Sequence, residues 1–155
     1  MKNLIIILML AMVSCKTNDA IVPSGDKNTI NSITNVGFFK KWKLASYENR
    51  KALNFNVIME LKPEKNEKGF YILNGKSTIN FYYAGFEYNT DNKTFSIKDI
   101  SVTEIAGAKA DQEIETDFLT RLAKIGKYEI SEDNKTLTLI STGNSPQKMY
   151  FVISE

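Results

Sequence analysis

The chain has no histidine, one cysteine and three prolines among its 155 residues. Without histidine, Ser-His-Asp triads and metal sites built from imidazole are excluded. A single cysteine can form neither an internal disulfide nor a multi-cysteine metal site. Lys and Arg number 20 against 18 Asp and Glu, and a net charge of +2 gives no basis for nucleic-acid binding. We therefore expect no enzyme activity, cofactor or metal.

A long apolar run is also missing, because the longest one spans only residues 4–13 (LIIILMLAMV) after the basic start Met1-Lys2-Asn3. A membrane-spanning helix needs about twenty apolar residues, whereas the apolar region of a secretory signal has about 7–15. The run ends at Ser14-Cys15. The N-terminus is therefore predicted to be an export signal. A buried first helix of the domain is the alternative, although the run has no polar face.

The end of this run resembles a bacterial lipoprotein signal, with the small Ser14 before Cys15 and the apolar Met12 where leucine is usual. The resemblance implies that residues 1–14 are removed, that the Cys15 thiol carries lipid, and that the new amino group is acylated, for example by palmitate. Lys16 is not an acidic retention signal, which favours the outer membrane, on its periplasmic or surface face. An ordinary signal peptide with an incidental cysteine is the other interpretation.

Residues 15–36 are predicted to be a flexible tether. They are rich in Asn, Ser and Thr, and Pro23-Ser24-Gly25 interrupts them. A coil of this length spans on average about 25 Å. In the alternative, Ile30, Ile33 and Val36 form a short strand or helix that docks on the domain.

The sequence of residues 37–155 predicts one globular domain built of short strands. Apolar residues alternate with polar ones in several segments, and two of these, 86–100 and 128–142, share an Asp-Asn-Lys-Thr turn and predict two similar β-hairpins. Residues 63–68 read as a charged turn, and Asn74-Gly75 locally favours a tight hairpin turn. The other strands are expected at 42–47, 55–61, 70–73, 76–80 and 149–153.

One segment has the period of a helix, because Ile114, Phe118, Leu122 and Ile125 form a single apolar stripe. Asp111 is the expected N-cap, and Lys124 followed by Gly126 is the expected end. The predicted fold is α+β and β-rich: a curved antiparallel sheet, or an open barrel-like meander, of about eight strands with one helix packed on it.

Over residues 37–153 the order of features resembles the META domain, the HslJ-type domain of bacterial envelope lipoproteins. The matching positions are Trp42 and Leu44, Gly75 and Asn80, Gly85, Thr103 and Ala106, Glu115, Phe118 and Leu122, Tyr128 and Ile130, and Leu137 and Leu139. Gly85 is followed by Phe86 or Tyr88 where the family has tyrosine.

The resemblance has two consequences for the fold. The two cysteine positions of the family hold Ile79 and Gly107, so no disulfide can join the Asn80 loop to the start of the helix, and core packing is expected to hold these elements unaided. The family also places Gly75 within, or at a bend of, one strand, against the local hairpin signal, and we prefer the family interpretation.

No residue is predicted to be catalytic. The acidic residues Asp111, Glu113, Glu115 and Asp117 are explained by the positive end of the helix dipole. Asn80 is expected to bond to loop backbone. The aromatic stretch 81–88 (FYYAGFEY) is either a core strand with a loop anchor or a ligand surface.

We predict a non-enzymatic envelope lipoprotein, held to the membrane by its lipid, with a protein-binding or envelope stress-associated role. Its partners would be the membrane and an envelope protein. The alternatives are a carrier or sensor of a small apolar ligand, or a protease inhibitor using residues 103–111 or 142–147; a hydrolase ranks last. A dry apolar cavity would favour the carrier, whereas a filled interior with an exposed apolar patch would favour protein binding.

Overall fold

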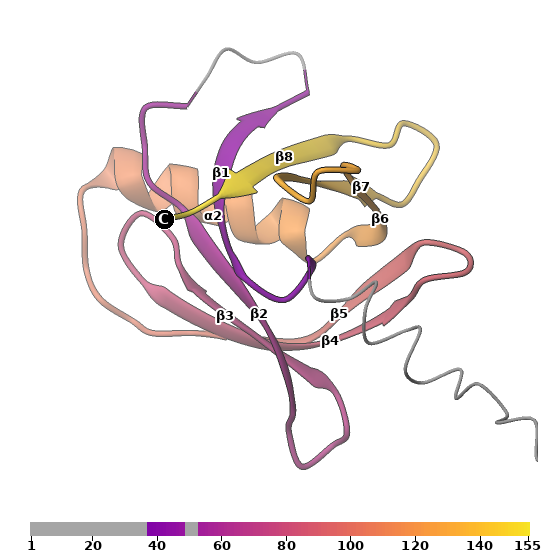
Figure 1. Cartoon of the computed structure of the whole chain (residues 1–155). Helices are drawn as coiled ribbons and strands as arrows, with labels where there is room; N and C mark the ends of the chain where they lie inside the picture. The colour runs from indigo at the N-terminus through magenta and orange to yellow at the C-terminus, as the bar shows by residue number, and fades with distance from the viewer. Residues whose placement is uncertain (1–36, 49–52) are drawn as a thin grey trace, which may run out of the picture.

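A computed structural model describes residues 37–48 and 53–155 (Figure 1). The predicted signal peptide, Cys15 and the tether of residues 15–36 lie outside these ranges. Eight antiparallel strands follow one another around a closed barrel in chain order, and β8 pairs with β1. The strands are β1 (Lys41–Tyr47), β2 (Ile58–Lys65), β3 (Tyr71–Lys76), β4 (Phe81–Asn89), β5 (Thr94–Val102), β6 (Ile125–Ile130), β7 (Thr136–Ser141) and β8 (Lys148–Ile153). The β-rich prediction is confirmed, and the barrel is closed rather than open.

Inward-facing side chains fill the barrel. Trp42 and Leu44 on β1 lie opposite Met59 on β2 and Phe151 on β8, and each of the four is at most 1% exposed. Phe86 and Phe95 stack with ring centroids 5.0 Å apart. Further aromatic rings join this stack around Phe38; they are Phe39, Tyr71, Tyr88 and Tyr128. The interior is thus a packed core.

The single helix among the described residues, α2 (Lys109–Leu122), lies between β5 and β6 in the chain. It bridges two sides of the barrel, because Phe118 contacts Tyr82 on β4 edge-to-face at 5.4 Å and Arg121 lies 4.6 Å over the ring of Tyr47 on β1. Figure 1 shows α2 between β8 and β5. Phe118 and Leu122 are fully buried, as the sequence predicted. No helix in the described part of the chain is long and apolar enough to cross a membrane.

The ends of α2 differ from the prediction. The N-cap is Ala108, with no side-chain cap, and Asp111 lies inside the first turn. The helix ends at Leu122, while Ile125 and Gly126 belong to β6. The buried stripe is therefore Glu115, Phe118 and Leu122, and Ile114 is only half-buried.

The local hairpin signal at Asn74-Gly75 is overridden, as the family interpretation requires. Strand β3 continues through Gly75, which lies between Met59 on β2 and Tyr82 on β4. A Cβ atom there would come within 2.1 Å of the Ile58 carbonyl oxygen and 2.5 Å of the Tyr82 hydroxyl. The glycine lets the Tyr82 ring cross β3 and donate a hydrogen bond of 2.9 Å to Ile58.

Other strand limits were also predicted wrongly. Strand β2 starts at Ile58 rather than Phe55, and it includes Pro63–Lys65 because a register irregularity between Lys62 and Lys65 accommodates the proline. The charged turn is confined to 66–69, where Asn66 Oδ1 accepts the backbone N–H groups of Lys68 and Phe70. Residues 77–80 form a turn rather than a strand.

The two predicted hairpins are confirmed as β4–β5 and β6–β7. Their turns nevertheless differ. The residue with positive φ is Lys93 in the first (56°) and Asn134 in the second (56°), and these are not equivalent positions in the shared motif. The same Asp-Asn-Lys-Thr sequence therefore adopts two different turn conformations.

Candidate functional site

A buried polar cluster joins α2 to the turn between β3 and β4. The Glu115 side chain comes from the buried stripe of α2, and the residue is only 8% exposed. Its Oε2 accepts the Ser77 hydroxyl and, at 2.8 Å, the backbone N–H of Asn80. Its Oε1 accepts the side-chain amide of Asn80 at 2.8 Å. A carboxylate thus occupies a position that the helix period reserves for an apolar residue.

Asn80 extends this cluster to the loop after β5. Its Oδ1 accepts the Thr103 hydroxyl at 2.8 Å and the backbone N–H of Ile105 at 2.7 Å. Its Nδ2 donates to the Ile105 carbonyl at 3.3 Å as well as to Glu115. These bonds use the donors and acceptors of the amide, which confirms that Asn80 bonds to loop backbone.

The Glu115 carboxyl is held ionised. Burial raises its pKa, but the hydrogen bonds from Ser77, Asn80 and the Ile79 backbone together outweigh burial, so the pKa lies below the ordinary value of 4.5. An ionised carboxylate with every oxygen engaged acts as an acceptor for neighbouring N–H and O–H groups. The helix dipole alone does not explain Glu115, and that prediction was wrong for this residue. Asp111 and Glu113 are exposed, as the dipole interpretation expects.

Ile79 and Gly107, at the family's two cysteine positions, touch each other. A Cβ atom added to Gly107 would lie 2.2 Å from Cδ1 and 2.8 Å from Cγ1 of Ile79. The isoleucine side chain therefore covers the glycine where the family has a disulfide. We had expected core packing to hold this junction unaided. The Glu115–Asn80 hydrogen bonds lie beside the contact and join the same elements, so that expectation was wrong.

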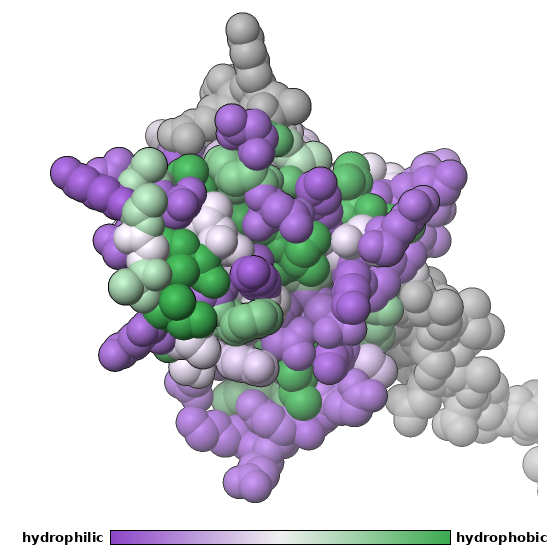
Figure 2. Space-filling view, turned by 90° about the vertical axis from the view of Figure 1, so that its left-hand side faces the viewer, coloured by the Kyte–Doolittle hydropathy of each residue, from purple (hydrophilic) through white to green (hydrophobic). Residues whose placement is uncertain are grey.

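An exposed apolar surface adjoins the cluster. It consists of Phe81 (47% exposed), Tyr83 (54%) and Ile105 (52%), and we call it the Phe81–Ile105 surface. Val102 (36%) pairs with the inward-facing Tyr82 and therefore lies on the other face of the sheet. Figure 2 views the molecule from the side that in Figure 1 carries the start of α2 and the loop before it, and shows apolar side chains gathered among hydrophilic ones.

The structure resolves the two interpretations of the aromatic stretch 81–88 by strand alternation. Tyr82 and Phe86 are fully buried in the core, whereas Phe81 and Tyr83 point outward. The stretch is thus both a core strand and part of an exposed surface. Ile105 lies in the segment 103–111 that the sequence offered only as a candidate inhibitory loop.

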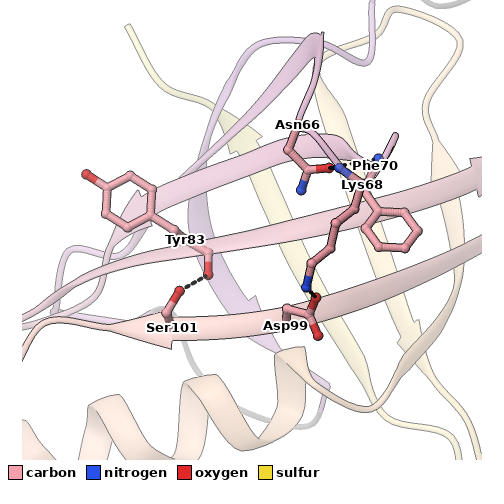
Figure 3. Close-up of polar contacts among 6 residues, drawn as sticks. All are labelled: Asn66, Lys68, Phe70, Tyr83, Asp99 and Ser101. Carbon is pink, nitrogen blue, oxygen red and sulfur yellow. Dashed lines mark hydrogen bonds and ion pairs between the residues drawn. The ribbon is translucent and has the colours of Figure 1, made fainter.

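A pocket of about 360 Å³ lies on the outside of the barrel, over β3, β4 and β5. Its lining residues include Asn66, Lys68, Ile72, Tyr83, Gly85, Asp99 and Ser101. Figure 3 shows Tyr83 on one side of this region and the ion pair of Lys68 and Asp99 on the other. The pocket opens on the barrel surface and not into the packed interior.

Carboxylates elsewhere are separated. Glu60 pairs with Lys62 at 3.6 Å and Glu87 with Lys98 at 3.2 Å. Strand β3 lies between β2 and β4, so Glu60 and Glu87 are not on adjacent strands. Within residues 37–48 and 53–155, no three acidic side chains gather as a potential metal site.

Comparisons with known proteins agree with this architecture. An NMR structure of a protein from Burkholderia xenovorans superposes with a TM-score of 0.58 at 15% identity, over 74% of this chain and 81% of that chain. A crystal structure of a DUF4847 family protein from Bacteroides vulgatus gives a TM-score of 0.50 at 10% identity, over 77% and 96%. At these identities the likeness shows the fold alone. No curated protein sequence matches the chain.

The META domain model matches residues 38–151, which is most of the chain. The match spans the barrel from the residues just before β1 into β8, and includes α2. The chain belongs to the META domain family.

Proposed function

We propose that this protein is a non-enzymatic envelope lipoprotein whose META domain binds another protein through the Phe81–Ile105 surface. The observation that carries the proposal is the exposure of two aromatic side chains and of Ile105 on neighbouring segments, where Thr103 N–H donates to the Phe81 carbonyl at 3.0 Å. Contiguous exposed apolar groups on a soluble domain mark interaction sites, and aromatic residues are enriched in the cores of interfaces.

Strand pairing and hydrogen bonds hold the segments that carry this surface. Phe81 and Tyr83 stand on the paired strand β4, and Ile105 is fixed through both of its backbone polar groups by Asn80. A surface that is ordered before binding loses less conformational entropy when the partner arrives. Asn80 and Glu115 are therefore positioning residues in this proposal.

The anchoring part of the proposal rests on the sequence of the N-terminus. Lipid on Cys15 would hold the domain at the outer membrane, and the tether would place it on average about 25 Å from the bilayer. The protein partner would then be an envelope protein.

A packed interior supports protein binding over carriage of a small apolar ligand inside the barrel. The side chains that line the barrel's centre are at most a few per cent exposed, among them Trp42, Leu73 and Phe151. A second candidate function, protease inhibition, is favoured by one observation: residues 103–108 are exposed and pinned at Thr103 and Ile105 by Asn80.

Site-specific photo-crosslinking in intact cells tests the proposal. A photoreactive phenylalanine analogue would replace Phe81 or Ile105 in the full chain, and Val152 on β8, which is 40% exposed, is the matched control position. We expect one crosslinked protein common to the first two positions and absent from the third. The same products from position 152, or none from 81 and 105, would contradict the proposal. A protease as the common product would favour inhibition.

A further inference from the structure

The pocket over β3, β4 and β5 is formed by a turn folded back on the sheet. Gly85 leaves the outer face of β4 bare, and Phe70 from the 66–70 turn fills part of that space: a Cβ atom on Gly85 would lie 2.9 Å from the Phe70 Cβ. Beside the glycine the floor is formed by the Ile72 side chain and by the backbone of Ala84, whose methyl group belongs to the core. The result is a concave apolar floor with polar groups around it.

A β-bulge places one of these polar groups. Tyr83 pairs with Ser101 and Gly85 with Lys98, so Asp99 and Ile100 together lie opposite Ala84. Asp99 adopts a φ of 50°, a left-handed conformation that is unfavourable for most side chains. Such backbone conformations cluster at functional sites. Here the conformation directs a carboxylate to the rim of the pocket (Figure 3).

The Lys68–Asp99 pair offers a donor and an acceptor side by side. Their charged atoms lie 2.7 Å apart, and both side chains are about two-thirds exposed, at 67% and 64%. Each charge of the pair neutralises the other, and Glu67 adds one more carboxylate to the lining, so the pocket disfavours an anion and suits a polar ligand without negative charge. Two neighbouring hydroxyl groups match it, since one accepts from the ammonium and the other donates to the carboxylate.

Two further groups extend this match. The Oδ1 atom of Asn66 is used by the turn, which leaves its amide NH₂ for other acceptors, and Figure 3 shows this nitrogen directed toward the strands. On the opposite side lies the half-exposed ring of Tyr83, whose hydroxyl points away from the Lys68–Asp99 pair (Figure 3). An exposed aromatic ring beside hydrogen-bonding groups suits a sugar, because a C–H face of the sugar can lie on the ring while its hydroxyl groups bond to the polar groups.

We propose that this pocket binds a neutral saccharide of one or two rings, stacked on Tyr83 and hydrogen-bonded by Asn66, Lys68 and Asp99. Its volume lies in the range of roughly 300–1,000 Å³ typical of small-molecule sites. This site goes beyond the protein-binding proposal. It shares only Tyr83 with the Phe81–Ile105 surface, so either proposal can fail without the other.

Methyl NMR on the full chain, in micelles of a detergent without a sugar headgroup, tests the saccharide site. The probes are methyl β-glucopyranoside and N,N′-diacetylchitobiose, with cyclohexanol and a leucine-containing tetrapeptide as comparisons. We expect a saccharide to shift the Ile72 methyl signal in a saturable, millimolar manner, while the buried Ile125 in β6 reports no change. The Tyr83→Ala and Asp99→Asn variants should each weaken binding roughly tenfold.

The matched controls are Tyr83→Phe, which keeps the ring, and Phe81→Ala, which removes an exposed aromatic residue outside the pocket lining. Asn tolerates positive φ, so Asp99→Asn removes the charge without forcing the backbone to change. Retained binding in both controls supports the site. No saturable shift with either saccharide, equal binding of cyclohexanol or the tetrapeptide, or an equal loss in Phe81→Ala would overturn it.

Discussion

The Asn80 amide and the Glu115 carboxylate form a buried hydrogen bond of 2.8 Å that joins the β3–β4 turn to α2. The same amide holds Ile105, so one asparagine connects the helix, the turn and the loop before the helix. The position of the exposed Ile105 side chain thus depends on a carboxylate buried behind it.

We expect Glu115→Gln to reduce the free energy of unfolding by about 1–3 kcal/mol at neutral pH, because buried donors lose a charged acceptor. The wild-type Glu115 pKa is lowered by folding, so its contribution is fully present above the ordinary pKa of 4.5 and is lost as pH falls through the folded value. The difference between the two proteins should therefore shrink on acidification.

Urea unfolding at a series of pH values measures this difference. Asp99 and Asp133 also have lowered pKa values, through their bonds to Lys68 and Ser131, but both are present in each protein and their effects cancel. A difference that stays constant from pH 7 to well below pH 4 would show that the Glu115 charge does not stabilise the fold.

Phe118→Ala should be strongly destabilising. The ring is fully buried and packs on Tyr82, and loss of a core phenylalanine costs about 3–5 kcal/mol. For a domain of this size, thermal unfolding should show a decrease of roughly 10–20 °C in Tm. The control is Thr120→Ala on the exposed side of α2, which should change stability by less than about 0.5 kcal/mol. Equal losses of stability in the two variants would show that the Phe118 side of α2 does not face the core.

Replacing Ile79 and Gly107 by cysteine should allow a disulfide to form. The Gly107 Cβ position lies 2.8 and 3.3 Å from the two γ carbons of Ile79, near the roughly 3 Å that separates a Cβ from the partner sulfur in a disulfide. Oxidation should stabilise the double variant by about 2–4 kcal/mol relative to its reduced form. In a Cys15→Ser background, mass spectrometry and unfolding check both results. Free thiols after oxidation would show that the contact is not as close as described.

The structural elements differ in how well the sequence predicts them. The two hairpins and the burial of Phe118 follow from period and turn chemistry, which are local. The close crossing of Tyr82 over Gly75 is not local, because β4 brings Tyr82 onto β3. The burial of Glu115 was missed for the same reason, since its partners Ser77 and Asn80 lie 38 and 35 residues away.

The exposed surface was the hardest part to predict. Phe81 and Tyr83 read as core residues until strand alternation assigns them to the outer face. Ile105 lies in a loop without period, and its exposure depends on hydrogen bonds to Asn80 that no sequence pattern shows.

Cys15→Ser should release the protein into the soluble fraction or leave it unprocessed. Several acyl chains, each contributing about 0.8 kcal/mol per buried CH₂, anchor a protein far more firmly than one chain can. Membrane fractionation and the mass of the N-terminus give the answer. A fully processed variant that still sediments with membranes would rule out the lipid anchor.

The most direct test of the central claim is the affinity of the crosslinked partner for variants of the Phe81–Ile105 surface, measured by calorimetry with the full chain. Phe81→Ser combined with Ile105→Ser should weaken binding by roughly a hundredfold, as expected when two interface anchors of more than 1 kcal/mol each are lost. Val152→Ser should bind as the wild type does. Equal affinities of the wild type and the double variant would contradict the claim that this surface is the site of protein binding.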